Sequence, residues 1–288
     1  MKRFFQVVVL LVACVSCVGY AGEINIDVLR KEANQGDAIA QNLLGAMYLE
    51  GQGVPQDYKK AFEWYRKAAD QGDVTAQRLL GAMYAEGKGV PQDDKKAFEW
   101  YRKAADQGDA VAQYSMGLAY AKGKGVPQDY KKAVEWYRKA ADQGDAGAQF
   151  WLGAMYFEGK GVPQDYKKAF EWYRKAADQG SVIAQNLLGA MYFEGKGVPQ
   201  DYKKAFEWLR KSADQGDAGA QFWLGRMYAE GKGVPYNPVQ AYMWYNLASS
   251  QGEEQARKYR DDLERKMTQE QIVEAQLCWF SENRTNRI

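Results

Sequence analysis

The residue types of this 288-residue chain that could support catalysis are mainly serine, lysine and the carboxylates. The chain has no histidine, which is the commonest general base and the commonest metal ligand. A nucleophile would have to be a serine paired with a lysine, or the reaction would have to use paired carboxylates. Ser115 and Ser212 lie in no catalytic motif, and the carboxylates recur at regular intervals, as structural residues would. We therefore expect a protein that is not an enzyme and that has no metal or cofactor.

The regular intervals come from a segment of 36 residues that occurs six times without a slip. A fixed period of this length indicates stacked supersecondary units, an array known as a solenoid. The predicted organisation is a leader at 1–21, a partial capping helix at 22–35, repeats at 36–71, 72–107, 108–143, 144–179, 180–215 and 216–251, and capping helices at 252–288.

Each repeat is predicted to form two helices. In the first copy, helix A is expected from Ala38 to Glu50, because Asp37 is a good N-cap and Gly51 favours termination. Helix B is expected from Tyr58 to Gln71 and is preceded by the N-cap Asp57. Both helices are too short to be stable alone, so stacking must stabilise them.

Two copies vary the predicted caps. Ser181 stands where the other A helices have Asp, and serine is also a strong N-cap. In the sixth repeat Asn237 and Pro238 replace Asp and Tyr at the start of helix B. Asparagine is an N-cap residue and proline is favoured at the first helical position, so the same helix start is predicted there.

One side of helix B is predicted to be core and the other to be solvated. Ala61, Trp64 and Tyr65 recur on one side, and the Trp series is expected to be fully buried. The opposite side is charged, and Glu63 and Lys67 are spaced to form an ion pair. In the sixth repeat this charged side becomes apolar, with the residues Val239, Met243 and Leu247. We therefore expect the C-terminal helices, predicted at 253–266 and 269–282, to cover it.

The variable side of helix A becomes aromatic from the third copy onward. Positions equivalent to Ala40, Leu44 and Tyr48 hardly vary and are expected to pack, whereas the opposite side differs between copies. Exposed aromatic clusters often mark recognition surfaces. We define the A-helix stripe, and predict it to bind a partner, as the residues Tyr114, Phe150, Trp151, Phe157, Phe193, Phe222, Trp223 and Arg226. The alternative is that these side chains pack between neighbouring repeats or against the C-terminal cap.

The N-terminus is typical of a secretory signal. Lys2 and Arg3 precede an apolar run from Phe4 to Val18, which is too short for a stable membrane span. Cleavage is predicted after Ala21, so the mature chain would have no integral membrane segment. The alternative is a bacterial lipoprotein box, with lipidation of Cys14.

The charge of the mature chain bears on its partners. Cleavage after Ala21 removes Lys2 and Arg3 and no acidic residue, so the remaining basic residues would equal the 37 acidic ones. A net charge of zero argues against nucleic acid or an anionic membrane as the main target. Cys278 would be the one cysteine left, so no disulfide framework is expected.

The repeat closely resembles Sel1-like repeats, which are related to tetratricopeptide repeats. The resemblance rests on Ala-Gln-x-x-Leu-Gly-x-Met-Tyr-x-x-Gly-x-Gly-Val-Pro-Gln-Asp followed by Ala-x-x-Trp-Tyr-Arg-Lys-Ala-Ala-x-Gln-Gly, and it covers residues 28–252. It implies an all-α, right-handed α/α superhelix with the A helices on the concave side. One subgroup has a disulfide in each repeat, and this chain lacks those cysteines.

The resemblance also implies a function. It implies a scaffold that binds protein partners in the bacterial envelope or at a host interface. We expect the protein to be monomeric and, given the leader, either periplasmic or secreted. Aromatic rows also stack on sugars, so a module that binds glycan or peptidoglycan fragments is the alternative. An envelope hydrolase is disfavoured, because the chain has no histidine.

Overall fold

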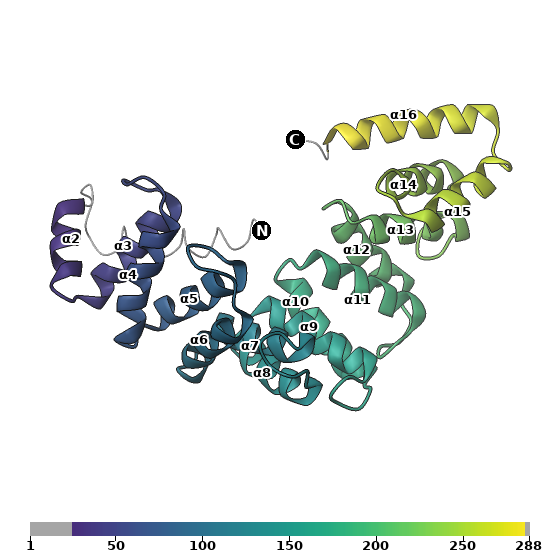
Figure 1. The fold of residues 1–288 in the computed structure, drawn as a ribbon. Coiled ribbons are helices and arrows are strands. Elements are labelled where there is room, and N and C mark those ends of the chain that lie inside the picture. The colour runs from purple at the N-terminus through teal and green to yellow at the C-terminus, as the bar shows by residue number, and fades with distance from the viewer. Residues whose placement is uncertain (1–24, 286–288) are drawn as a thin grey trace. The chain divides into compact units, whose positions relative to one another are not determined.

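The computed structural model describes residues 25–285, which form fifteen helices and no strand (Figure 1). The A helices of the six repeats are α3 (Ala38–Glu50), α5 (Val74–Glu86), α7 (Ala110–Lys122), α9 (Ala146–Glu158), α11 (Val182–Glu194) and α13 (Ala218–Glu230). The B helices are α4 (Tyr58–Asp70), α6 (Asp94–Asp106), α8 (Tyr130–Asp142), α10 (Tyr166–Asp178), α12 (Tyr202–Ala213) and α14 (Pro238–Ser250). The flanking helices are α2 (Ile26–Asn34), α15 (Glu254–Glu264) and α16 (Gln269–Thr285). The predicted all-α solenoid is therefore confirmed.

The chain divides into two compact units, Met1–Trp136 and Tyr137–Ile288, with the boundary inside α8. Within each unit, the A helix of a repeat packs against its own B helix, and that B helix packs against the next A helix. Each unit therefore has one layer of A helices and one layer of B helices, with the core between them. The signal segment 1–21, with its alternative lipidation at Cys14, lies outside the described residues.

The helix boundaries follow from local residues. Asp37 Oδ1 accepts a hydrogen bond from the Ala40 backbone N–H at 2.7 Å, which caps the first A helix. Gly51 ends that helix in the left-handed conformation, with φ of 74°. Asp57 Oδ1 accepts from Lys60 N at 3.1 Å at the start of the B helix. The predicted starts and the glycine stop of helix A are confirmed.

The two variant caps differ in outcome. Asn237 accepts a hydrogen bond from Gln240 N at 3.0 Å, and Pro238 occupies the first helical position, as predicted. Ser181 makes no side-chain capping bond, so the prediction of a strong N-cap at this position is wrong. The backbone of Ser181 still accepts from Gln185 N, and the helix starts at the expected place.

The deepest aromatic residues of the core are tyrosines of the B helices. The Tyr65 side chain has 0% exposure, and its ring lies on Gly45 of the A helix. A Cβ atom at Gly45 would be 2.8 Å from the Tyr65 ring, so only glycine allows this close packing. The same pairing recurs between Gly153 and Tyr173. Burial raises the pKa of the Tyr65 hydroxyl well above its usual value.

The prediction that the whole Trp series is core is wrong for four of its six members. Trp64, Trp136, Trp172 and Trp208 are only partly buried. Lys67 Nζ lies 3.8 Å from the Trp64 ring centroid, so this lysine covers the indole.

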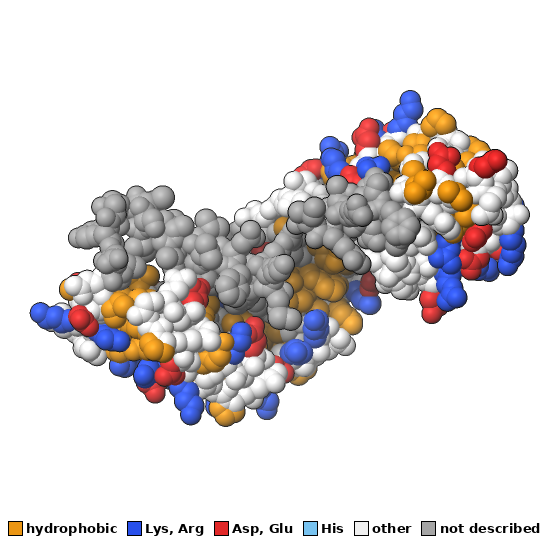
Figure 2. Space-filling model, turned by 90° about the horizontal axis from the view of Figure 1, so that it is seen from above, with side chains coloured by type: hydrophobic (Ala, Val, Ile, Leu, Met, Phe, Trp, Pro, Cys, Tyr) orange, Lys and Arg blue, Asp and Glu red, His pale blue; other side chains and the backbone are white. Residues whose placement is uncertain are grey.

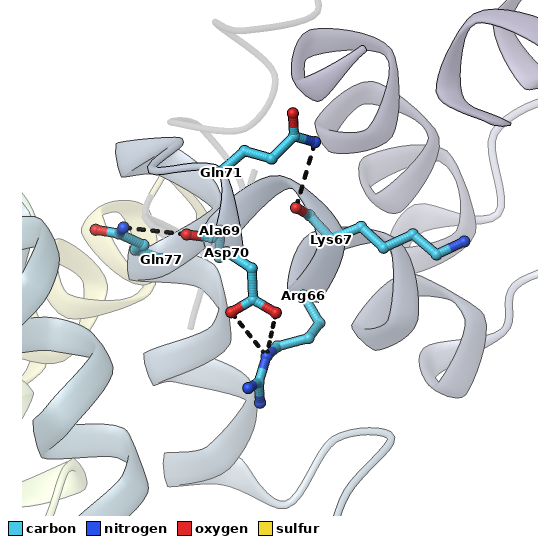
Figure 3. Close-up of polar contacts among 6 residues, drawn as sticks. All are labelled: Arg66, Lys67, Ala69, Asp70, Gln71 and Gln77. Carbon is cyan, nitrogen blue, oxygen red and sulfur yellow. Dashed lines mark hydrogen bonds and ion pairs between the residues drawn. The ribbon is translucent and has the colours of Figure 1, made fainter. Parts of the chain in front are cut away.

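The two buried indoles, Trp100 and Trp244, each have an arginine as an additional cover. The Arg66 guanidinium lies 5.0 Å from the Trp100 ring, and Arg210 lies 5.0 Å from the Trp244 ring. Each of these arginines belongs to the preceding repeat, so the depth of an indole depends on its neighbour. The charged side of helix B is otherwise exposed as predicted, but its ion pair is Arg66 Nε–Asp70 Oδ2 at 2.9 Å (Figure 3) and not Glu63–Lys67, because Lys67 lies over the Trp64 ring.

A buried glutamine on each A helix links neighbouring helices. Gln77 Nε2 donates to the Ala69 carbonyl of the preceding B helix at 3.2 Å (Figure 3). Gln107 Nε2, at the end of the following B helix, donates to Gln77 Oε1 at 2.8 Å. Both hydrogen bonds recur at Gln149, which contacts Ala141 and Gln179. Each such glutamine therefore joins three successive helices through its amide.

The C-terminal helices α15 and α16 pack against α14 and cover its apolar side. Val239, Met243 and Leu247 are buried there, as predicted. Ala275 of α16 is also buried, in a cluster with Val239. The helix α16 begins with a capping box, in which Thr268 N donates to Gln271 Oε1 and Gln271 N donates to Thr268 Oγ1. Among the described residues, no helix is both long enough and apolar enough to span a membrane.

Candidate interaction surface

The residues of the A-helix stripe lie on four A helices. Tyr114 belongs to α7 in the first unit and is partly buried. The other seven belong to the second unit, namely Phe150, Trp151 and Phe157 on α9, Phe193 on α11, and Phe222, Trp223 and Arg226 on α13. Figure 2 shows that hydrophobic side chains gather in places on the face that it draws, with lysine and arginine side chains nearby.

The three stripe residues of α9 are partly buried, and each ring contacts a tyrosine of a B helix. The pairs, with their centroid distances, are Trp151–Tyr137 at 6.5 Å, Phe150–Tyr173 at 5.8 Å and Phe157–Tyr166 at 5.1 Å. Trp151 is stacked on Tyr137 with an interplanar angle of 12°. The tyrosines thereby fix the orientation of these rings, while part of each ring stays accessible to a ligand.

Two stripe residues are buried and have a packing role. Phe193 contacts Tyr202 at 5.1 Å and Trp223 at 5.0 Å. Phe222 contacts Tyr259 of α15 at 5.5 Å, so it packs against the C-terminal cap. The expectation of packing therefore applies to these two side chains, whereas Trp223 and Arg226 are partly exposed.

Charged groups surround the aromatic rings at the end of α13. The Arg226 guanidinium lies 4.8 Å from the Trp223 ring, and Arg226 Nη2 pairs with Glu230 Oε1 at 3.0 Å. Lys232 Nζ pairs with Glu230 Oε2 at 2.7 Å. Desolvation would raise the pKa of Glu230, but the hydrogen bonds from Lys232 and Arg226 outweigh it and hold the pKa below its usual value. The carboxylate is therefore ionised and fixes both cations.

The stripe also has a polar counterpart that the sequence analysis missed. Asn42 Nδ2 donates to Asp73 Oδ1 at 2.9 Å, so it links one A helix to the N-cap of the next. Asn186 and Asp217 repeat this link at 2.8 Å. In the second repeat the buried Arg78 takes the same position, with its Nε 3.3 Å from Asp109 Oδ2. The spacing of 31 residues between a polar residue and the next cap was the available signal.

An open pocket of about 590 Å³ lies between α8, α9 and α10 in the second unit. Arg138 Nη2 donates to the Tyr156 hydroxyl at 2.6 Å in its wall, and Trp172, Lys175 and Asp178 are also at its lining. These groups include no nucleophile paired with a base. Within the described residues, no group of three or more His, Cys, Asp or Glu side chains is placed to hold a metal ion.

Comparisons with known proteins agree with the fold. A crystal structure of a protective antigen present in uropathogenic Escherichia coli strains superposes with a TM-score of 0.82 and 38% identity, over 92% of this chain and 57% of the antigen. A Sel1 repeat protein from Oxalobacter formigenes superposes with a TM-score of 0.70 and 41% identity, over 82% of this chain and 68% of that protein. This chain thus spans little more than half the length of the first relative. A comparison with curated proteins finds no match.

A family model described as Sel1 repeat matches residues 38–73, 74–109, 110–145, 146–181, 182–217 and 218–253. The matches are consecutive and cover all six helix pairs. The chain therefore belongs to the Sel1 repeat family.

Proposed function

We propose that the second unit binds a protein partner through the exposed part of the A-helix stripe. Sel1 repeat proteins are generally protein-interaction scaffolds, and their solenoid fold is typically non-catalytic. We also propose that the chain is exported after cleavage behind Ala21 and acts in the bacterial envelope or at a host interface. The export proposal rests on the sequence of the leader.

The observation that carries the binding proposal is the exposure of rings that the repeat does not need. Trp151 and Trp223 are partly exposed. Other repeats have a leucine at the same position, namely Leu43, Leu79 and Leu187, so the fold does not require tryptophan there. Aromatic residues supply much of the binding energy at protein interfaces. The comparison between copies also supplies a mild substitution, because leucine is compatible with the fold at this position.

In vivo crosslinking tests this proposal directly. A photoreactive amino acid at position 151 should give a specific protein adduct in living cells, identified by mass spectrometry. The control is the same amino acid at position 203, which is exposed on a B helix. Adducts that are identical at both positions would refute the proposal, and an adduct with a peptidoglycan fragment would favour the glycan alternative.

The partner identified in this way allows a quantitative test. Trp151→Leu and Trp223→Leu should each weaken binding by about thirtyfold, since single interface anchors contribute ~2 kcal/mol or more. Both variants should melt close to the wild type. Tyr173→Ala is the reference for a change in the core. Tyr173 is buried, so this substitution should lower the free energy of unfolding by roughly 3–5 kcal/mol. Leucine variants that melt like Tyr173→Ala and bind normally would show that the stripe is core.

A further inference from the structure

We propose that Arg226 is an anchor for a carboxylate of the partner, so that the preferred partner segment has an Asp or Glu beside a large apolar residue. This inference rests on the proposed function and specifies its partner. The site comprises Arg226, Trp223, Glu230 and Lys232, with the Phe193 ring beneath them, and all of these residues belong to the second unit.

The repeat itself does not need this arginine. The equivalent residues of the other five copies are Ala46, Ala82, Leu118, Ala154 and Ala190. Helix A forms and packs in each of those copies without a charge at this position. No other repeat therefore has an arginine at this position, and a function specific to the last repeat is the simplest reason for Arg226.

The guanidinium is held in a fixed position with donors to spare. It lies 4.8 Å from the Trp223 ring and 5.4 Å from the Phe193 ring, so aromatic faces hold its plane. Nε and Nη2 each donate one N–H to Glu230 Oε1, at 3.1 and 3.0 Å. A guanidinium has five N–H donors, so three remain for a further acceptor. The side chain is 24% exposed, which makes those donors reachable.

The charge balance at this site differs from that of other repeats. Elsewhere one glutamate pairs with one lysine, as in Glu158–Lys160 at 2.6 Å and Glu194–Lys196 at 2.8 Å. In the last repeat Glu230 pairs with both Arg226 and Lys232, which leaves an excess of one positive charge. A single carboxylate would neutralise that excess, whereas a phosphate group has about 1.5 to 2 negative charges and would overcompensate it. Charge complementarity therefore favours an acidic peptide segment.

The neighbouring ring specifies the second part of the ligand. Trp223 is partly exposed beside the guanidinium, so an apolar side chain next to the bound carboxylate can pack on its free surface. An anchor of this kind combines a bidentate charged contact with aromatic burial, and both are typical of residues that dominate binding energy.

Selection from a phage library of random dodecapeptides, with full-length protein as the target, tests the inference. The wild type should enrich peptides with Asp or Glu adjacent to Trp, Phe, Tyr or Leu. Arg226→Glu should select Lys or Arg at that place instead. For a synthetic peptide from the wild-type selection, Arg226→Ala should weaken binding by about thirtyfold. The matched control Lys203→Ala removes an equal charge from an exposed site of the same unit and should leave binding unchanged.

The outcomes separate this inference from the function on which it rests. Alanine occurs at this position in four other copies, so Arg226→Ala should fold normally, and a melting curve verifies this. Peptides without acidic enrichment that lose binding on Trp223→Leu would overturn the carboxylate anchor and leave the binding stripe intact. A library that gives no binder to the wild type would overturn both. Equal loss of binding in Arg226→Ala and Lys203→Ala would show that only net charge matters and would also overturn the anchor.

Discussion

Replacement of Gln149 by alanine should lower the free energy of unfolding of the second unit markedly, although the glutamine side chain is uncharged. Gln149 is 5% exposed and makes two side-chain hydrogen bonds. Its Nε2 donates to the Ala141 carbonyl at 3.2 Å, and its Oε1 accepts from Gln179 at 2.8 Å. The alanine would remove both bonds, and with them the side-chain link between α8, α9 and α10.

The magnitude follows from the groups that are lost. Each hydrogen bond contributes about 0.5–1.5 kcal/mol, and the loss of the one buried Cγ methylene group costs about 0.8 kcal/mol. The Ala141 carbonyl keeps a hydrogen bond from Gly144 N, so it is not left without a partner. The sum is about 2–4 kcal/mol, which corresponds to a decrease in melting temperature on the order of 10 °C.

Calorimetry and urea denaturation measure this effect, and the chain offers a matched control. Gln164 also donates from Nε2 to a backbone carbonyl, that of Phe157 at 2.9 Å, but it is exposed. Gln164→Ala should therefore cost less than about 1 kcal/mol. Gln149→Met, which keeps the volume, separates the hydrogen bonds from the packing. Equal shifts for Gln149→Ala and Gln164→Ala would refute the linking role of the buried glutamine.

Deletion of residues 253–288 should expose the apolar side of α14 and cause aggregation in size-exclusion chromatography, and a monomer with an unchanged melting temperature would contradict the capping role. N-terminal sequencing of the exported protein should find Gly22 first, whereas a lipidated Cys14 would show lipoprotein processing. A backbone hydrogen bond from Lys60 lowers the pKa of the Asp57 carboxyl, so its contribution to stability is present above about pH 4 and is lost as the pH falls further. The midpoint of urea denaturation should therefore decrease below about pH 4. It should be constant between about pH 6 and 8, because the chain has no histidine, and a change in that range would show that groups other than the carboxylates set the pH dependence.

The helices could be predicted from the sequence because their boundaries depend on adjacent residues. An aspartate before the first turn and a glycine after the last one act within a single helix. Asp37 and Gly51 could therefore be assigned without knowledge of the tertiary structure, and the structure has both in those roles. Ser181 shows the limit of this reasoning, since a residue type suited to capping need not make the bond.

Burial depth could not be predicted in the same way, because it depends on the neighbouring repeat. Trp100 is buried where Arg66 covers it, and Trp172 is only partly buried although the two repeats are nearly identical in sequence. The deeper burial of Tyr65 results from its contact with Gly45 on the other helix of the same repeat. The buried glutamines were also missed as links, since their partners lie 8 and 30 residues away.

Variation between copies has two physical sources, which the contacts of the stripe separate. At the position of Asn42 and its equivalents, a polar side chain binds the aspartate N-cap of the next repeat, as Asn42 binds Asp73. Where this position is Phe150, the next cap is Ser181, which makes no side-chain capping bond. The polar residues at this position thus serve the contact between repeats, but the position does not simply follow the cap, since Tyr114 also precedes an aspartate cap, Asp145. Trp223 and Arg226 belong to the last repeat and contact Phe193 of the preceding one, so no cap of a following repeat accounts for their residue types.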